Sequence, residues 1–375
     1  MATVTSPTSP EPPSAEQIGL FAYQVASQMS GAVTAGMIHL GDRLGLYRAL
    51  GAAGRPLTSR ELAVATGLVE RWVREWAHNQ AAAHLLVVER DGAGDSGADG
   101  ERFSLAPEAV PVLVDEHHEM CLLGMFHQLP QTMAKLEVLP ESFRTGVGHD
   151  YDSHGPEAAV GIERTFEPWM GAHLVADVLP LLDGVVDRLA AGTAVADIGC
   201  GSGSAVFELA RAFPASAFVG YDISRHALDR AAERLAERGL TNVAFHDPRD
   251  APVPVDGSLG LVTTFDCLHD MTDPSGTMRT IRGALAEDGT WLLVDITAHD
   301  TFAQNVERNP MAALMYGGSV LTCMSSALSQ PGGAGLGTLG LSAGRAEAMA
   351  REAAFTRFRR LDVEHPINAF YEIRP

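Results

Sequence analysis

A histidine followed by an aspartate stands just beyond an apolar stretch in the second half of the chain. Leu259–Phe265 has the composition of a buried strand, and Asp266, His269 and Asp270 follow it. Side chains at the carboxyl end of a parallel strand face the ligand crevice of such a sheet. Histidine, with an ordinary pKa of about 6.5, can take a proton from a hydroxyl group near neutral pH. We predict that His269 is a general base supported by Asp270. The competing interpretation is a histidine that only caps a turn.

A glycine-rich turn near the middle of the chain is the second candidate site. The apolar run Ala194–Ile198 contains Asp197 and enters a turn with glycine at every second position, namely Gly199, Gly201 and Gly203. Glycine permits positive φ and close approach to a ligand, and the helical spacing after the turn puts unpaired N–H groups beside it. The dinucleotide fingerprint fits in neither register, and the P-loop lysine is missing. We expect a polar ligand of another class, or a glycine-rich turn without a ligand.

Acidic residues end the next two expected strands. Asp222 ends the stretch from Ala217 and lies 25 positions after Asp197 (222 − 197), where a carboxylate can accept hydrogen bonds from both hydroxyls of a ribose. The alternative for Asp222 is capping of the helix that follows. Asp247 comes after the expected strand 242–245, and Pro248 next to it has no N–H to offer a ligand.

Strands and helices alternate from the glycine turn onward, which predicts an α/β fold with a Rossmann-like, doubly wound parallel sheet. Expected strands are 194–198, 217–222, 242–245, 259–265 and 290–296, with helices at 226–238 and 277–285 between them. Residues 355–363 and 367–373 form a closing hairpin at the sheet edge. The domain with these strands spans 183–375. Its long insertion 298–340, rich in glycine and methionine, is expected to form a lid over the pocket.

The preceding part, 15–110, is mostly helical and is predicted to be a winged helix. Apolar residues recur every three or four positions from Ala15 to Leu50. A capped helix after Thr58, a second helix over 69–84 and two strands joined by a polar loop at 91–100 then give the order helix, turn, helix, hairpin. The apolar helical stretch at the chain end predicts a homodimer; the alternative is packing on its own domain. Residues 111–182 are expected to be a helical linker that contributes to a substrate pocket.

Composition excludes several classes of function. The formal net charge is −20, and DNA-binding domains and anionic membranes call for basic surfaces, so we expect neither nucleic acid nor membrane as a partner. The four cysteines are widely spread without C-x-x-C, which indicates reduced thiols in a cytoplasmic protein and no metal site. No apolar run has the length of a membrane span. The Ser/Thr/Pro-rich residues 1–14 are expected to be a disordered tail.

The acid-headed glycine turn resembles the first motif of class I methyltransferases that use S-adenosylmethionine (SAM). The resemblance implies SAM as cofactor and S-adenosylhomocysteine (SAH) as product. The cofactor contacts that it implies, or that the strand ends supply, are Asp197, Gly199, Gly201, Gly203, Asp222, Ile223, Asp247, Pro248, Phe265 and Asp266. Two positions depart from the family: Pro248 removes a backbone N–H that often binds adenine, and Gly260 stands where the family commonly has Asp.

The whole layout resembles the winged-helix, dimeric small-molecule O-methyltransferases, and more closely a bacterial branch of secondary metabolism. Their base lies in an L-H-D-W motif that matches 268–271, except that Met271 replaces Trp. Their F-N-x-x-M-x-x-H segment is similar to 166–173, with Glu167 in place of Asn. The resemblance implies that Met170 clamps the substrate. We also assign substrate contacts to His173, Tyr151 and Tyr316.

These observations predict methyl transfer from SAM to a small organic molecule, with a hydroxyl acceptor favoured and His269 and Asp270 as catalytic residues. Transfer to nitrogen or carbon is an alternative. A SAM-binding fold that has moved to other chemistry, such as cyclisation, is another. A winged-helix regulator that senses SAM is the alternative from outside the enzymes, and a mobility-shift measurement with DNA separates it from the others.

Overall fold

The computed structural model describes residues 12–90 and 100–375. Its contacts divide the chain into two compact units, and the boundary along the chain lies between Ala106 and Pro107. Most of the expected tail 1–14 and of the loop 91–100 lies outside the described residues. Among the helices described, none combines the length and hydropathy that crossing a membrane requires.

The first unit has the winged-helix order that the sequence predicts. Its elements are α1 (Ala15–Arg43), α2 (Leu46–Ala53), β1 (Leu57–Thr58), α3 (Ser59–Thr66), α4 (Glu70–Ala82), β2 (Val87–Arg90) and β3 (Glu101–Ser104), with an antiparallel sheet in the order β1-β3-β2. Thr58 caps α3 in a reciprocal pair with Glu61, which satisfies two N–H groups at the helix start. The strand β1 was not expected from the sequence.

The stretch from Ala15 to Leu50, which the sequence predicts to be helical, forms two helices, α1 and α2. The chain turns at Gly45, whose φ of +72° is left-handed and open to glycine at little cost. Gly31 and Gly36, which would permit breaks, instead lie inside the unbroken α1. The apolar side chains of its first half are exposed, namely Ile18, Leu20, Phe21, Tyr23, Val25, Met29 and Val33.

The second unit begins with short helices and then enters the sheet. These are η1 (Pro107–Ala109), α5 (Val110–Leu113), α6 (Leu123–His127), α7 (Leu129–Ala134), η2 (Lys135–Glu137), α8 (Leu139–Thr145), η3 (Tyr151–His154), α9 (Gly155–Trp169), η4 (Met170–Val178), η5 (Leu179–Leu181) and α10 (Val185–Ala191). The segment η4 is a π-helix that continues α9, and π-helical turns are often found at functional sites.

A seven-stranded sheet in the order β6-β5-β4-β7-β8-β10-β9 forms the centre of the second unit. The strands are β4 (Ala194–Ile198), β5 (Ala217–Tyr221), β6 (Val243–His246), β7 (Leu259–Phe265), β8 (Leu285–Ile296), β9 (Arg357–Arg360) and β10 (Asn368–Arg374). The first five are parallel, and β10 and β9 add an antiparallel edge. This confirms the doubly wound prediction. The strand β8 starts at Leu285, earlier than the sequence indicates.

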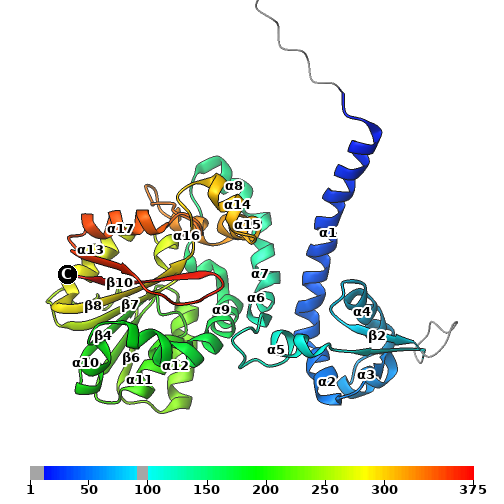
Figure 1. Ribbon diagram of the computed structural model, residues 1–375, viewed down its shortest axis with the longest axis horizontal. Helices are drawn as coiled ribbons and strands as arrows, with labels where there is room; N and C mark the ends of the chain where they lie inside the picture. The colour runs from blue at the N-terminus through cyan, green and yellow to red at the C-terminus, as the bar shows by residue number, and fades with distance from the viewer. Residues whose placement is uncertain (1–11, 91–99) are drawn as a thin grey trace, which may run out of the picture. The chain divides into compact units, whose positions relative to one another are not determined.

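Helices cover both faces of this sheet (Figure 1), and each face has its own apolar core. On one face, side chains of α13 (Pro274–Ala284) and α17 (Ala343–Glu352) pack on Trp291 and Leu293 of β8. On the other, η4, α10 and α11 (Ser204–Ala212) pack on Val195 and Leu292. The remaining crossover helix, α12 (Arg225–Arg238), is capped by Ser224 as expected.

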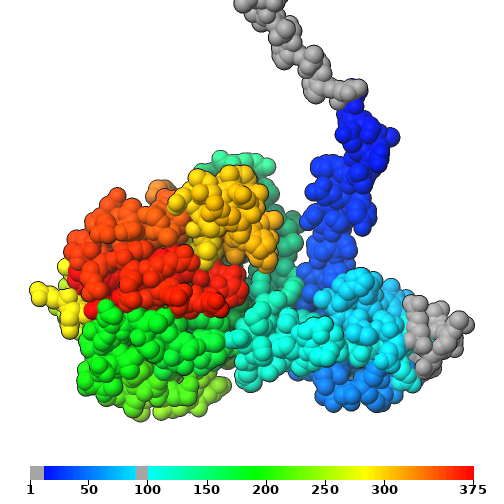
Figure 2. Space-filling view, viewed as in Figure 1, coloured from blue at the N-terminus to red at the C-terminus, as the bar shows by residue number. Residues whose placement is uncertain are grey.

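The insertion 298–340 folds into α14 (Phe302–Arg308), α15 (Ala312–Leu321) and α16 (Cys323–Ala327), followed by irregular chain. It packs against the loop before α9: Gly148 N–H donates to Leu328 O at 2.9 Å, and His154 Nε2 lies 2.9 Å from Ser326 Oγ. In Figure 2 the yellow and orange insertion covers part of the second unit next to the teal helices. The insertion therefore forms part of the packed fold.

Candidate active site

The turn between β4 and α11 has a left-handed residue at each of its three glycines. Gly199, Gly201 and Gly203 have φ of +73°, +54° and +84°. A Cβ on Gly199 would lie 2.7 Å from Cys267 Sγ, and one on Gly203 would lie 2.5 Å from the Phe245 ring. A Cβ on Gly201 would meet nothing within 4 Å. Packing therefore fixes the two outer glycines, whereas Gly201 presents open backbone that a ligand can approach.

Asp222, directly after β5, holds this turn in place. Its carboxylate accepts the Gly201 N–H at 2.7 Å and the Ser224 N–H at 2.8 Å. Burial raises the pKa of Asp222 although these N–H groups favour the charged form. Each carboxylate oxygen can accept a second hydrogen bond, so Asp222 can still receive ribose hydroxyls.

A buried arginine supports the glycine turn from behind. Arg234 of α12 is 2% exposed, and its Nη1 donates to Ser202 O at 2.9 Å and to Ser204 Oγ at 3.2 Å. Its other nitrogens pair with Glu163 and Glu167 of α9. The sequence interpretation did not include Arg234. The only sequence signal is its place on the apolar stripe of α12, three positions after the buried Ala231.

At the end of β6, Asp247 is paired with an arginine that the sequence interpretation did not consider. Arg249 Nε donates to both Asp247 carboxylate oxygens at 2.8 and 2.9 Å, and its Nη2 donates to Ile223 O at 2.7 Å. This pairing holds the pKa of Asp247 below its usual range. The Ile223 side chain beside it is about half exposed, at 47%. Pro248 lies between Asp247 and Arg249.

Asp197 of β4 lies inside the sheet rather than in the turn itself. It is 3% exposed, and it accepts the Thr263 hydroxyl of β7 at 2.6 Å. Burial raises the pKa of Asp197 to about 7, although the hydroxyl opposes this. The hydroxyl of Thr263 therefore links the first strand of the predicted cofactor motif to the strand that leads to His269.

The hydrogen bond that orients His269 comes from Asp295 at the end of β8. His269, in η6 (Leu268–Asp270), donates its Nδ1–H to Asp295 Oδ1 at 2.6 Å, and both side chains are at most 3% exposed. Burial disfavours the imidazolium, but Asp295 and, to a smaller extent, Cys323 outweigh it and raise the pKa of His269 well above its usual range. In the described residues no hydrogen bond joins Asp270 to His269. Adjacent side chains of a helical turn point apart, whereas β8 ends beside η6.

Asp266 lies close to His269 and Asp295, and its backbone is strained. It is a non-glycine residue with φ of +49°, and such conformations concentrate at functional sites. Asn368 Nδ2 donates to its Oδ1, and burial, with Asp295 nearby, raises the pKa of Asp266 to about 7. The structure thus places Asp266 in the His269 group. Phe265, which precedes Asp266, packs against the apolar core that contains Val195 and Leu292.

Of the four predicted substrate contacts, Tyr151 lies among the acids of the site. Burial raises the pKa of its phenol well above the usual range, and Asp270 and Asp222 add to this effect. Burial likewise raises the pKa of Asp270. The Tyr151 phenol is therefore near enough to Asp270 and Asp222 for both carboxyl groups to act on its pKa.

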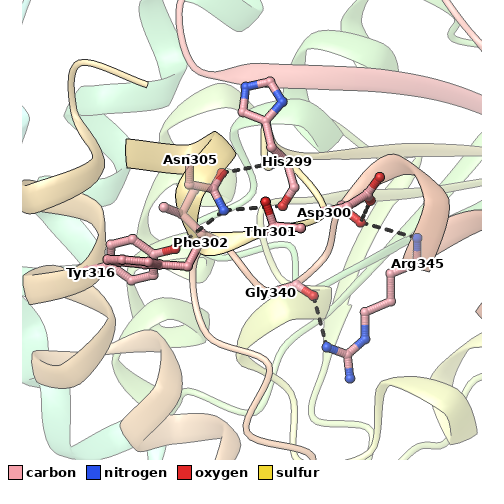
Figure 3. Close-up of a pocket in the computed structure, with 10 residues that line it drawn as sticks. His299, Asp300, Thr301, Phe302, Asn305, Tyr316, Gly340 and Arg345 are labelled. Carbon is pink, nitrogen blue, oxygen red and sulfur yellow. Dashed lines mark hydrogen bonds between the residues drawn. The ribbon is translucent and has the colours of Figure 1, made fainter. Parts of the chain in front are cut away.

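The other three predicted contacts lie elsewhere. Met170 is buried in the core that also contains Cys200. His173 pairs with Glu119 and, at 2.6 Å, with Asp177 on the surface of η4. Tyr316 lines a separate cavity of about 320 Å³ (Figure 3), together with His299, Phe302 and Arg345. There its hydroxyl accepts from Asn305 Nδ2 at 3.4 Å.

Comparison with known proteins identifies both units. Residues 189–334 match the family model described as "Methyltransferase domain", and residues 32–93 match "Rv2258c-like winged HTH domain". Residues 189–334 of the chain therefore carry a methyltransferase domain. A 106-residue stretch is 34% identical to the polyketide synthase ThaQ of Burkholderia thailandensis; the match covers 28% of this chain and 5% of that protein.

Solved methyltransferases share the fold over nearly the whole chain. Human N-acetylserotonin methyltransferase in complex with SAM is 16% identical, with a TM-score of 0.66 over 94% of this chain and 97% of that one. The mitomycin 7-O-methyltransferase MmcR is 19% identical, with a TM-score of 0.67 over 96% and 99%. NcsB1 from neocarzinostatin biosynthesis, in complex with SAM and 2-hydroxy-5-methyl naphthoic acid, is 17% identical, with a TM-score of 0.57 over 91% and 95%.

The described residues fit SAM at the methyltransferase turn. Gly201 leaves open space next to backbone N–H groups, Asp222 has acceptor capacity for hydroxyls, and Ile223 offers an exposed apolar side chain for a flat ring. Asp247, by contrast, is already neutralised by Arg249, and Pro248 adds no N–H. The residues fit the ribose and amino-acid end better than the adenine.

Arg234→Met tests the support behind the turn. It removes a buried charge that Glu163 and the Ser202 carbonyl compensate, so we expect a loss of unfolding free energy of about 3–5 kcal/mol. Arg238→Met is the matched control, because Arg238 pairs with the same Glu167 but is exposed, and its loss should cost at most about 1 kcal/mol. Urea unfolding measures both. Equal losses would show that Arg234 does not support the turn.

Proposed function

We propose that the chain transfers a methyl group from SAM to a hydroxyl group of a small organic molecule, with His269 as general base. The observation that carries this proposal is the buried His269–Asp295 hydrogen bond at the carboxyl edge of the parallel sheet, the same edge that carries the glycine turn. The expected cofactor turn and the proposed base therefore lie at the same edge of the sheet.

The residues of the chain divide the work between them. When bound, SAM supplies an electrophilic methyl group on a sulfonium. Asp295 fixes Nδ1 of His269 as a donor, so that Nε2 is the nitrogen that takes the proton from the substrate hydroxyl. Asp295 then stabilises the imidazolium that results. Gly201, Asp222 and Tyr151 position the reactants, and positioning alone supplies a large part of the acceleration in such displacements.

Unsatisfied acceptors near His269 favour a substrate with hydrogen-bond donors. Among the described side chains, Asp266 Oδ2, Asp295 Oδ2 and Asn368 Oδ1 are buried without a partner. All three are acceptors, and leaving one buried and unpaired costs about 1–3 kcal/mol. A hydroxyl group, an ammonium or water can supply the donors. An amine is therefore the second candidate for the group that receives the methyl. A purely hydrocarbon substrate, which has no hydrogen-bond donor, fits poorly.

Structural relatives support a substrate of secondary metabolism. MmcR is named for mitomycin, and NcsB1 was solved with a hydroxylated naphthoic acid. We infer a flat, hydroxylated molecule of similar size for this chain. The region around η3 and α16, where His154 lies 2.9 Å from Ser326, would then select among such molecules.

Calorimetric titration with SAH tests the cofactor. We expect micromolar binding to the wild type and at least tenfold weaker binding to Asp222→Asn, because the variant weakens acceptance from Gly201 N–H and from the ribose. Asp250→Asn, on the exposed turn after β6, is the control and should bind like the wild type. Undiminished binding to Asp222→Asn would contradict the assigned site, and binding to neither protein would contradict the function.

The protonation of His269 gives a second test. Since its pKa is raised, the imidazole becomes a base only as the pH rises through that pKa. Turnover of a hydroxyl substrate should therefore increase with pH above 6.5, and Asp295→Asn should move this rise to lower pH. NMR titration of the labelled imidazole measures the shift without a substrate. His226→Gln on α12 serves to assign the signals, and a His269 pKa at or below 6.5 would refute the assigned role of Asp295.

We also propose that two copies associate through α1. The apolar side chains of α1 between Ile18 and Val33 are each more than half exposed, and such a surface indicates a partner. A second copy is the natural partner, because the helix would bury the same stripe on both chains.

Phe21→Asp combined with Met29→Asp tests the dimer. The variant leaves every buried contact intact, so the fold should persist while dimerisation weakens tenfold or more, or about 1.4 kcal/mol. Light scattering after gel filtration measures the mass. Val255→Asp introduces the same charge at an exposed valine of the second unit and should remain dimeric. A wild type with the mass of one chain would end this proposal.

A further inference from the structure

A cavity of about 320 Å³ lies in the second unit beyond the carboxyl end of β8 (Figure 3). Its walls come from three segments: the turn after β8 with the start of α14, the middle of α15, and the chain that leads into α17. This volume is at the lower end of the range of about 300–1,000 Å³ that small-molecule sites have. The described residues that line it do not include His269, Asp295 or Asp222, so it is a second candidate site.

A buried asparagine of α14 holds two walls of the cavity together. Asn305 is 2% exposed, and its Oδ1 accepts the His299 N–H at 2.9 Å. Its Nδ2 donates to His299 O at 3.2 Å and to the Tyr316 hydroxyl at 3.4 Å. The start of α14 is closed by a reciprocal cap between Thr301 and Gln304. The walls of the cavity are therefore fixed by the fold.

Asp300 is the carboxylate among the lining residues, and its charge is already compensated. Its Oδ1 accepts the Ser342 hydroxyl at 2.6 Å, and Ser342 caps α17 by accepting the Arg345 N–H at 3.3 Å. Asp300 therefore lies at the N-terminus of a ten-residue helix, where the aligned peptide dipoles stabilise a negative charge. A cationic ligand is not needed to balance it.

The guanidinium of Arg345 has no such compensation. Its Nη1 donates to the Gly340 carbonyl at 3.3 Å, and no carboxylate of the described residues forms an ion pair with it. Arg351 on the same helix, by contrast, pairs with Glu347 at 2.7 Å. A guanidinium carries five N–H donors in a plane, and two of them match the oxygens of a carboxylate. The donors that Arg345 does not use are available to an anionic ligand.

Two aromatic rings lie at the other end of the cavity. The ring centroids of Phe302 and Tyr316 are 5.7 Å apart, with 49° between the ring planes. Figure 3 shows both rings on the side opposite Arg345, with Gly340 between them and the guanidinium. Phe302 is 69% exposed, so its ring is open to an edge-to-face or offset contact with a ring of a ligand.

We propose that this cavity binds a small aromatic carboxylate, with its ring on Phe302 and Tyr316 and its carboxylate at Arg345. A neutral aromatic molecule would leave the guanidinium without an acceptor, and an inorganic anion would leave the two rings uncovered. The inference rests on the cavity and its lining residues and does not require methyl transfer.

Ligand-observed NMR titrations of the whole protein with phenylacetate and phenylacetamide test the proposal. The two probes have the same ring and nearly the same shape, and only phenylacetate carries a charge. We expect the acid to bind at least about fivefold more tightly than the amide, because its contact with Arg345 is charge-assisted. In Arg345→Gln the acid should lose this preference while the amide binds as before, which also shows that the variant is folded. Phe302→Ser should weaken the binding of both probes.

Arg351→Gln is the matched control, because it removes a guanidinium of the same helix that already has a partner, so the preference for the acid should persist. Excess SAH should displace neither probe. The proposal is overturned by equal affinity of the wild type for the two probes, by an unchanged preference in Arg345→Gln, or by displacement of phenylacetate by SAH, which would place the acid in the cofactor crevice. Because SAH binding is measured on its own, the proposed function can stand or fall separately.

Discussion

Buried negative charge at the carboxyl edge of the sheet is the constraint on which the site depends. Asp197, Asp222, Asp266, Asp270 and Asp295 all have side chains that burial pushes toward protonation or that need donors. The structure answers this need locally with the Gly201 and Ser224 N–H groups, the Thr263 hydroxyl, the Asn368 amide and one imidazole. What is left unsatisfied calls for a ligand with donors or positive charge, and SAM, a sulfonium with an ammonium group, has both.

Two helices outside the sheet, α12 and α9, support this edge. Arg234 reaches the back of the glycine turn from α12, and its charge is balanced by Glu163 and Glu167 of α9. Glu167 stands where the related enzymes commonly have an asparagine, so this departure is explained by an ion pair with the arginine that supports the turn. The turn, α12 and α9 therefore form one electrostatic unit, and a change in any of them affects the backbone at which the cofactor is expected.

The sequence predicted correctly those elements whose signals lie within a few neighbouring residues. The apolar runs and glycines of 194–203, the cap at Ser224 and the capped helix after Thr58 carry their own signals, and the structure has these elements there. Asp295 as the hydrogen-bond partner of His269 could not be predicted in this way, because the order of the strands in the sheet decides it. The sequence pointed to Asp270 because that residue is adjacent to His269 along the chain. The break at Gly45 was missed because an apolar stripe continues across it.

The insertion changes what His269 can meet. In the described conformation the chain that follows α16 packs on η6: Gly337 N–H donates to His269 O at 3.0 Å, and Ala334 N–H donates to Thr272 O at 2.9 Å. If His269 is the base, its surroundings therefore include a segment outside the parallel sheet. Because the buried carboxylates of this edge belong to the sheet and to the segments directly after its strands, the side chains of the insertion can change without removing those carboxylates.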